Sequence, residues 1–409
     1  MYTRLFTGLL ATGVLLISSW AQATGFRNPP EGAAALGRVG GRIAQIDDAS
    51  AIVNNPANLA YVKDGEILAS YMLVYSDVKY TDPSGISTET KDKDKHIPNF
   101  FGAMGIGEDN SVMLGLGVTS PWGQSTIWPE DRPFLGTAPY HAELVTINLS
   151  PTIAARIADR VLVGAGVDIM YSELDLRQHL PLLGVGGPLT SLRLQGDGEG
   201  FGFHAGVTWE VVDDHRLAAT YRSPIEIDYD GDTDVGGFVG PLAPRSSFSS
   251  EIEFPTMVGL GYGIELSDDL RVGIDVEWIE FSKFDEFPVD VGVNGAFGLF
   301  PPSIPQLWDD TWTFGIGGDY QLNEAWVLRA GYIFMESPVP QATLSPTLPD
   351  DDRNVFSVGA GYHGQHHGLD IAYAINVFDR DVTENAMPAF NGEYELTGHL
   401  AQVSYRYAF

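Results

Sequence analysis

The chain has 409 residues and no cysteine, which excludes a disulfide framework and thiol chemistry. It also has few basic residues, with 23 lysines and arginines against 54 aspartates and glutamates. The formal net charge of −31 argues against nucleic acid as a partner, because polyanions bind basic surfaces. The acidic balance fits a surface that is exposed to salt water or rich in contacts with divalent ions.

No apolar run of about 20 residues, the length of a membrane-spanning helix, occurs after the N-terminal region. The N-terminal region itself has Arg4, an apolar run from Leu9 to Trp20, and the small-x-small sequence Ala21-Gln22-Ala23. We expect residues 1–23 to be a secretory signal peptide that is removed. A membrane anchor is the alternative, but the apolar run is short for a span.

The chain is instead rich in β-type patterning, with 47 glycines and 11% aromatic residues. Between Trp312 and Leu322, apolar residues alternate with polar residues such as Thr313 and Asp319, which is the period of a strand with one polar face. Fourteen such strand-like runs follow one another: 66–81, 97–107, 111–120, 142–157, 160–178, 193–211, 215–229, 250–266, 269–284, 310–322, 325–336, 354–364, 367–378 and 395–409.

The connections between these runs alternate strictly between short turns and long loops. The seven long loops are 82–96, 121–141, 179–192, 230–249, 285–309, 337–353 and 379–394. An even strand number with alternating short and long connections is typical of an outer-membrane β-barrel. A soluble sandwich or propeller has no reason to sort its loops in this way. We therefore predict an all-β fold, a 14-stranded antiparallel transmembrane β-barrel over residues 63–409.

The segment 24–62 has neither a helical nor a strand period, yet it is apolar and rich in glycine. A barrel of fourteen strands is too wide for its own side chains to fill. We therefore expect residues 24–62 to form a compact hatch, or plug, inside the lumen.

Several short motifs resemble those of one known family. They are Gly25-Phe26, Asp47-Asp48-Ala49 followed by Asn55-Pro56-Ala57, Tyr221-Arg222-Ser223 leading to Ile227-Asp228-Tyr229, and Ser337-Pro338-Val339-Pro340 followed by Pro349-Asp350-Asp351-Asp352-Arg353. In this order and at these spacings they are similar to the FadL/TodX (OMPP1) family of long-chain fatty acid and hydrocarbon transporters of Gram-negative outer membranes. The resemblance implies capture of a hydrophobic ligand by extracellular loops, passage to an internal apolar pocket, and release sideways through an opening at a kinked third strand.

The resemblance also makes Phe26 the tip of the hatch that contacts the ligand, with ordinary packing as the alternative. Asp47 and Asp48 are expected to pair with arginines of the lumen. Asn55, Pro56 and Ala57 are expected to seat the hatch or to move with it, although an Asx-Pro turn also accounts for them.

Two long loops carry apolar residues, which are costly in water unless they bind a ligand or pack on each other. The candidates for hydrophobic capture are Leu180, Leu182, Leu183, Val185, Val235, Phe238, Val239 and Leu242, and Trp122, Trp128, Phe134 and Leu135 extend the same surface. On the third strand, Gly115 and Gly117 face the lumen and Pro121 ends the strand, which suits a kink. Turn geometry alone also explains Pro121.

A fatty acid needs a cation for its carboxylate. The candidates are Arg156, Arg177, Arg222 and Arg329, and pairing with lumen acids is the alternative for each. No secure carboxylate clamp follows from the sequence, so neutral hydrocarbons remain open as substrates. The acidic runs 230–234 and 350–352 either hold Ca²⁺ or are solvated loops. We predict no catalytic residue, no metal site and no cofactor.

The expected protein is therefore not an enzyme but a passive outer-membrane transporter for long-chain fatty acids or similar hydrophobic compounds. Uptake of aromatic or alkane hydrocarbons by the same fold, or a polar-solute porin, is the alternative. The expected partners are outer-membrane lipid and lipopolysaccharide, the hydrophobic ligand, and the outer-membrane assembly machinery. That machinery reads C-terminal strands similar to Val403-Ser404-Tyr405-Arg406-Tyr407-Ala408-Phe409.

Overall fold

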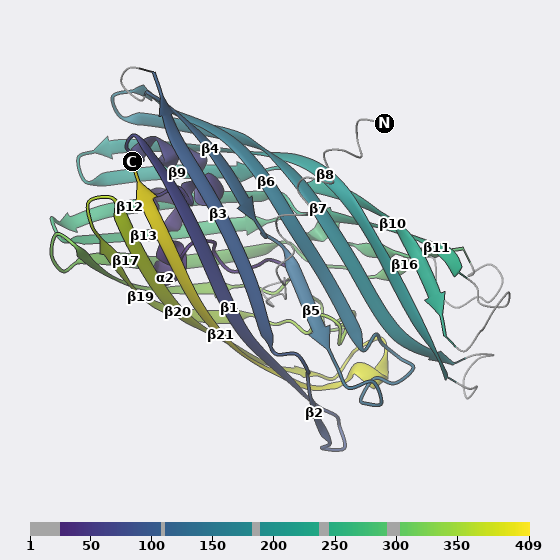
Figure 1. Ribbon diagram of the computed structural model, residues 1–409. Coiled ribbons are helices and arrows are strands. Elements are labelled where there is room, and N and C mark those ends of the chain that lie inside the picture. Colours follow the sequence, from purple (N-terminus) through teal and green to yellow (C-terminus); the bar gives the residue numbers. More distant parts are fainter. Residues whose placement is uncertain (1–24, 108–110, 182–188, 237–244, 293–302) are drawn as a thin grey trace, which may run out of the picture.

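The computed structural model describes residues 25–107, 111–181, 189–236, 245–292 and 303–409. Within them, a closed antiparallel barrel of 14 strands surrounds a small helical hatch (Figure 1). The barrel closes because the last strand pairs with the first, with Glu66 opposite Ala408 and Thr81 opposite Glu393. The predicted fold class is confirmed. The predicted signal peptide, residues 1–23, lies outside the described residues.

The wall begins with β1 (Gly65–Thr81) and β3 (Asp94–Ile106), and its third strand is divided into β4 (Val112–Thr119) and β5 (Gly123–Ile127). It continues with β6 (His141–Ala158), β7 (Val161–Pro181), β8 (Leu189–Val212), β9 (His215–Arg222), β10 (Ile225–Val235), β11 (Arg245–Phe254) and β12 (Met257–Ser267). It ends with β13 (Leu270–Ile279), β15 (Asp290–Val291), β17 (Thr311–Gln321), β18 (Trp326–Met335), β19 (Arg353–His363), β20 (His367–Val382) and β21 (Gly392–Ala408).

The connections hold the remaining short elements. These are the strands β2 (Ser87–Glu89), β14 (Glu286–Pro288) and β16 (Ser303–Pro305), and the 3-10 helices η3 (Phe281–Lys283) and η4 (Pro388–Phe390).

The burial pattern of the wall is the reverse of that in a water-soluble protein. On β17, Trp312 and Phe314 are each 46% exposed, whereas Thr311 and Thr313 are each 1% exposed. Soluble proteins bury such apolar side chains and expose such polar ones. The apolar face therefore meets lipid and the polar face lines the lumen.

Four short helices make up the hatch: α2 (Ala33–Arg38), α3 (Arg42–Gln45), α4 (Ala51–Asn54) and η1 (Pro56–Tyr61). They lie inside the barrel near the end that carries the C-terminus (purple in Figure 1). None of the helices in the described ranges is long and apolar enough to cross a membrane. Helices this short are not stable alone, so contacts with the wall hold them in place.

Glycines of the hatch lie directly against the backbone of the wall. A Cβ on Gly40 would lie 2.2 Å from the backbone nitrogen of Ile316, and a Cβ on Gly41 would lie 2.5 Å from the carbonyl oxygen of Gly273. Gly41 also has a φ of +66°, a conformation that favours glycine. These contacts explain why the hatch sequence is rich in glycine.

Several wall strands differ from their predicted limits. β8 begins at Leu189 rather than at 193, and β10 includes residues 230–234, which were predicted to begin a loop. This acidic stretch has no apolar pattern, but its backbone forms strand pairings with β8 and β11. Conversely, the seventh strand is interrupted at Ser223-Pro224, because proline offers no N–H to the ladder.

Candidate functional site

The third strand of the wall is interrupted between β4 and β5, which Figure 1 shows as separate arrows. β4 pairs with both β3 and β6, whereas β5 forms a ladder with β6 alone. Within the described ranges, residues 94–99 of β3 have a ladder partner only on the β1 side. The ladder of the wall therefore has a gap between β3 and β5, apart from a single bridge between Lys91 and Ile127, and the predicted kink residue Pro121 lies at the edge of this gap.

The N-terminal segment of the hatch runs along this interruption. The backbone N–H of Asn28 donates to the carbonyl oxygen of Pro121 at 2.9 Å, and that of Gly123 donates to the carbonyl oxygen of Phe26 at 2.8 Å. The Asn28 side chain adds a bond to the carbonyl oxygen of Ser120 at 2.8 Å. Residues 26–28 are thus tied to the edge of the wall gap.

Gly115 and Gly117 of β4 face the hatch. This agrees with the prediction that both glycines face the lumen. A Cβ on Gly115 would lie 2.7 Å from Leu59, and a Cβ on Gly117 would lie 3.3 Å from Ile52. Their absent side chains thus make room for hatch residues beside the gap. Their part in a lateral opening stays a prediction.

Phe26 lies in a cluster of aromatic rings and is only 4% exposed. Its ring centroid is 5.3 to 5.8 Å from those of Trp122, Phe254, Phe281, Phe284 and Trp308. These rings come from the strand interruption, the end of β11, the η3 turn and the segment before β17. Four of the five contacts are edge-on, a favourable geometry for aromatic pairs. The role of Phe26 as ligand contact stays a prediction.

Asp350 anchors the start of the hatch to an extracellular loop. Its carboxylate accepts from the backbone N–H of Gly25 at 3.0 Å and from the Ser337 hydroxyl at 2.9 Å, and it pairs with Arg353. The Gly25-Phe26 motif therefore meets the motifs at 337–340 and 349–353, which are more than 300 residues away in the sequence. Protein donors therefore surround the Asp350 carboxylate, and Ca²⁺ binding by the acidic run 350–352 stays an open alternative.

The two hatch aspartates have different partners. Asp47 pairs with Arg271 of the wall at 2.8 Å, as expected. Burial opposes ionisation of Asp47, but the Arg271 guanidinium outweighs it and holds the pKa of Asp47 at about 2. Asp48 instead accepts from the backbone N–H of Ser50 at 2.8 Å, and no arginine lies within ion-pair distance of it among the described residues. The expected arginine pair for Asp48 is therefore not formed.

The sequence analysis did not predict that arginines of the hatch pair with acids of the wall. Arg27 and Arg42 of the hatch pair with Glu277 of the wall at 3.0 and 2.7 Å, and Arg38 pairs with Asp319 at 3.0 Å. The alternation of its strand already placed Asp319 on the polar face. The basic residues of the hatch were the available signal for the partners of such wall acids.

Asn55 connects the hatch to the wall. Its amide donates to the carbonyl oxygen of Ile43 at 2.8 Å and to the hydroxyl of Thr208 at 2.9 Å, while its oxygen accepts from the N–H of Ala57 at 3.1 Å. The last bond caps η1, as expected of an Asx-Pro turn. Pro56 lies against Gly164, where a Cβ would be 2.4 Å from the Pro56 carbonyl carbon. This geometry fits the predicted seating role.

The predicted capture residues lie only partly in the described ranges. Leu180 and Val235 are buried in the same apolar cluster as Phe26, together with Trp128 and Phe134, whereas Leu135 is 45% exposed. Leu182, Leu183, Val185, Phe238, Val239 and Leu242 lie outside the described residues.

A cavity occupies the lumen between the hatch and the wall. Its lining includes Arg27, Arg42, Pro121, Trp122, Arg222 and Glu277. The cavity therefore lies next to Phe26, because Arg27 lines it, and it extends to the interruption of the third strand, because Pro121 and Trp122 line it too. Apolar side chains, among them Leu36, Ile333, Val355 and Leu400, line it as well. Such a mixed lining suits an amphipathic small molecule.

The four candidate arginines have different surroundings. Arg156 pairs with Glu210 at 3.0 Å, Arg177 with Asp175 at 2.8 Å, and Arg329 with Asp370 at 2.6 Å. Arg222 alone of the four lines the cavity.

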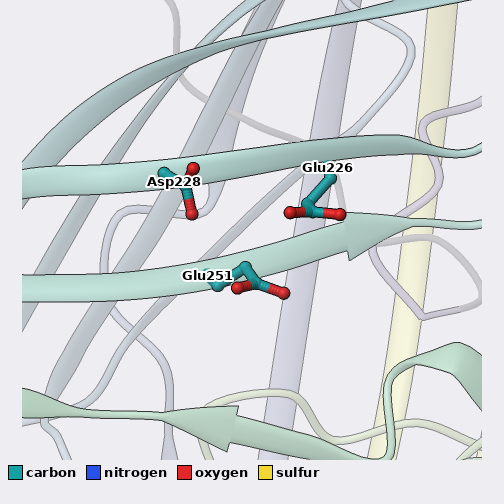
Figure 2. Close-up of side chains that lie close together, drawn as sticks. All are labelled: Glu226, Asp228 and Glu251. Carbon is teal, nitrogen blue, oxygen red and sulfur yellow. The ribbon is translucent and has the colours of Figure 1, made fainter.

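Two groups of metal-ligand type residues lie away from the cavity. Glu226, Asp228 and Glu251 project from β10 and β11 with carboxylate oxygens within 4.8 Å of one another (Figure 2). All three are exposed, on the strand face opposite to the buried Ile227. The turn histidines contact separate partners, His363 with Asp370 and His367 with Tyr405. Neither group contributes to the lining of the cavity.

Comparisons with known proteins agree with this architecture. The family described as outer membrane protein transport protein (OMPP1/FadL/TodX) matches residues 14–409. A long-chain fatty acid transport protein of Escherichia coli O6:H1 is 27% identical over 398 residues, covering 88% of this chain and 88% of the relative. A 47 kDa outer membrane protein of Pasteurella multocida is 23% identical over 380 residues, covering 87% of each.

Solved structures have the same fold. A FadL homologue of Pseudomonas aeruginosa superposes with a TM-score of 0.81 at 23% identity, covering 94% of this chain and 100% of the homologue. The toluene transporter TbuX of Ralstonia pickettii gives a TM-score of 0.73 at 19% identity, covering 93% and 99%. The chain therefore belongs to the OMPP1/FadL/TodX family of outer membrane transport proteins.

Proposed function

We propose that this protein carries long-chain fatty acids passively across the outer membrane. The observation that carries the proposal is the meeting of three features at residues 26–28: an aromatic cluster, a lumen cavity and a gap in the wall. The name of the Escherichia coli relative supports the fatty acid, whereas the toluene transporter among the similar structures favours a neutral hydrocarbon as the second candidate.

The proposed route follows the geometry. Extracellular loops capture the ligand, which displaces Phe26 from the aromatic cluster and enters the cavity. The same displacement breaks the bond from Gly123 to Phe26, so ligand entry loosens the hatch from the edge of the wall gap. The ligand then leaves sideways into the membrane through the gap. The route needs no catalytic step and no cofactor.

The proposal divides the chain into a signal peptide (1–23), a hatch (24–62) and a barrel (63–409). It includes lipopolysaccharide as the neighbour of the wall and the assembly machinery as a partner of the C-terminal strand. A polar-solute porin is disfavoured, because hatch and wall are in backbone contact at Gly40 and Gly41.

Direct binding tests this function. Radiolabelled palmitate, hexadecane and toluene are added separately to detergent-purified protein. We expect saturable binding of palmitate. Binding of the hydrocarbons alone would keep the transport route and change the substrate, and binding of none of the three would contradict the proposal.

A further inference from the structure

Arg222 is the last residue of β9, immediately before the interruption at Ser223-Pro224. Its neighbour Tyr221 faces outward and is 38% exposed, so strand alternation directs Arg222 into the lumen. The Ser223 N–H donates to the Phe203 carbonyl oxygen at 2.9 Å, which holds the chain to β8 at this point. Arg222 thus presents its guanidinium to the cavity from the wall.

The other arginines of the cavity are paired. Arg27 and Arg42 share Glu277, at 3.0 and 2.7 Å. Arg353 pairs with Asp350, and both side chains are almost fully buried. These three guanidinium groups therefore already have an anionic partner.

Arg222 differs from them. Within the described ranges, no carboxylate lies within ion-pair distance of its side chain, and the two acids that interact with it electrostatically are Glu31 and Asp168. Asp168 already accepts from Asn148 at 2.7 Å, Ser150 at 2.8 Å and His204 at 3.0 Å. Burial raises the pKa of Glu31 in spite of the opposing charge of Arg222, so Glu31 is a weak competitor for the guanidinium.

We propose that Arg222 receives the carboxylate of an acidic hydrophobic ligand in the lumen cavity, which makes the substrate a fatty acid rather than a neutral hydrocarbon. A guanidinium offers a planar fork of N–H donors that matches a carboxylate. The same cavity has apolar side chains in its lining, among them Leu36, Ile333 and Leu400, which a hydrocarbon chain can contact. The inference rests on the proposed transport function and specifies its substrate class.

The experiment compares palmitate with methyl palmitate and hexadecane, which lack the carboxylate. Binding is measured on detergent-purified wild type, Arg222→Gln, Arg222→Lys and Arg216→Gln. Arg216 is the matched control, because it lies on the same face of β9 but pairs with Glu265 at 3.5 Å. Heat-modifiable migration of each variant on gels checks that the barrel has folded.

We expect Arg222→Gln to weaken palmitate binding by about tenfold or more, the equivalent of one charge-assisted hydrogen bond. Binding of methyl palmitate and hexadecane should stay unchanged, Arg222→Lys should keep part of the palmitate affinity, and Arg216→Gln should bind like wild type.

Two results would overturn the inference: wild-type palmitate affinity in Arg222→Gln, or an equal loss of all three ligands that Arg222→Lys does not repair. A wild type that binds hexadecane but not palmitate would also overturn it while leaving hydrocarbon transport intact. Failure of the wild type to bind any of the probes would instead overturn the proposed function.

Discussion

Phe26 shows how a single residue connects the hatch to several segments of the barrel. Its ring contacts aromatic side chains from four separate segments of the barrel. Aromatic pairs of this geometry contribute roughly 0.5–1.5 kcal/mol each. Several such contacts hold the tip firmly, and the proposed route requires that a hydrophobic ligand offer similar contacts in its place.

Replacing Phe26 with Glu tests this role. An ionised carboxylate among aromatic rings is strongly disfavoured, so we expect residues 25–28 to leave the cluster and hydrophobic uptake to fall by roughly tenfold or more. Phe26→Leu is the matched control and should retain most of the uptake. Uptake of labelled palmitate by whole cells is the measurement. Equal uptake in both variants would show that Phe26 has only a packing role.

A second prediction concerns Asn55, which bonds to Thr208 of the wall. We expect Asn55→Ala to destabilise the hatch by about 1–3 kcal/mol, because it removes a cap and two buried hydrogen bonds. Thr208→Val should cost less, and the double variant should cost less than both effects added together. Hydrogen exchange of the amides of α3 and η1 measures this stability. Fully additive effects would mean that the two side chains do not act together.

The sequence predicted part of this residue-level picture. The pairing of Asp47 with an arginine of the wall and the turn at Asn55 were predicted, whereas the role of Phe26 as ligand contact stays a prediction. The pairing of Arg27 and Arg42 with Glu277 was not predicted, because it depends on how the hatch is rotated inside the barrel. No pattern along one strand records that rotation.

At the scale of elements, the hatch is held by its fit to glycines of the wall. Gly206 of β8 and Gly164 of β7 leave the space that Asn55 and Pro56 occupy, and a Cβ on Gly206 would lie 2.2 Å from the Asn55 oxygen. The wall therefore accepts the hatch only in this position. Strand alternation predicts that these glycines face the lumen, but not which hatch residue each one meets.

Changing Gly206 to Val should unseat η1 while the barrel still assembles. We expect single-channel conductance in planar bilayers to rise from nearly none to a measurable open level. Gly102→Ala is the control, since a Cβ at Gly102 has no atom within 4 Å. A closed Gly206→Val channel would contradict the idea that this contact seats the hatch.

The interruption of the third strand is the element on which the proposed lateral release depends. Gly115, Gly117 and Pro121 indicated a kink, but the continuation of the strand as β5 was not predicted. β5 reads Gly-Gln-Ser-Thr-Ile and has no apolar face. It is nevertheless a strand, because its backbone pairs with β6. Almost all of its side chains are buried. The alternation of apolar and polar residues therefore did not predict β5, because contacts with distant segments bury its polar side chains.

For the whole molecule, the loop lengths and the period of two were sufficient to predict the fold. β17, for example, exposes Trp312 and buries Thr313. The alternation of apolar and polar residues in the sequence already separates these two faces. What the sequence did not record is how the loops and the hatch fill the lumen. Those contacts join segments hundreds of residues apart, such as Gly25 and Asp350.

The central claim is that the ligand leaves through the gap in the wall between β3 and β5. Lys95 and Ser125 face each other across it, with Nζ and Oγ 3.1 Å apart. Because the natural chain has no cysteine, Lys95→Cys with Ser125→Cys introduces the only two thiols. A reducible crosslinker about as long as a lysine side chain then joins the two edges. Asp197→Cys with Asp230→Cys is the control, because these residues are already neighbours in the intact ladder.

The decisive measurement is uptake of labelled palmitate by cells that carry the crosslinked pair, before and after reduction. We predict that the crosslink across the gap stops uptake, that reduction restores it, and that the control crosslink has no effect. Binding of palmitate to the purified crosslinked protein should persist. Undiminished uptake with the gap crosslinked would contradict lateral release and show that the ligand leaves along the lumen.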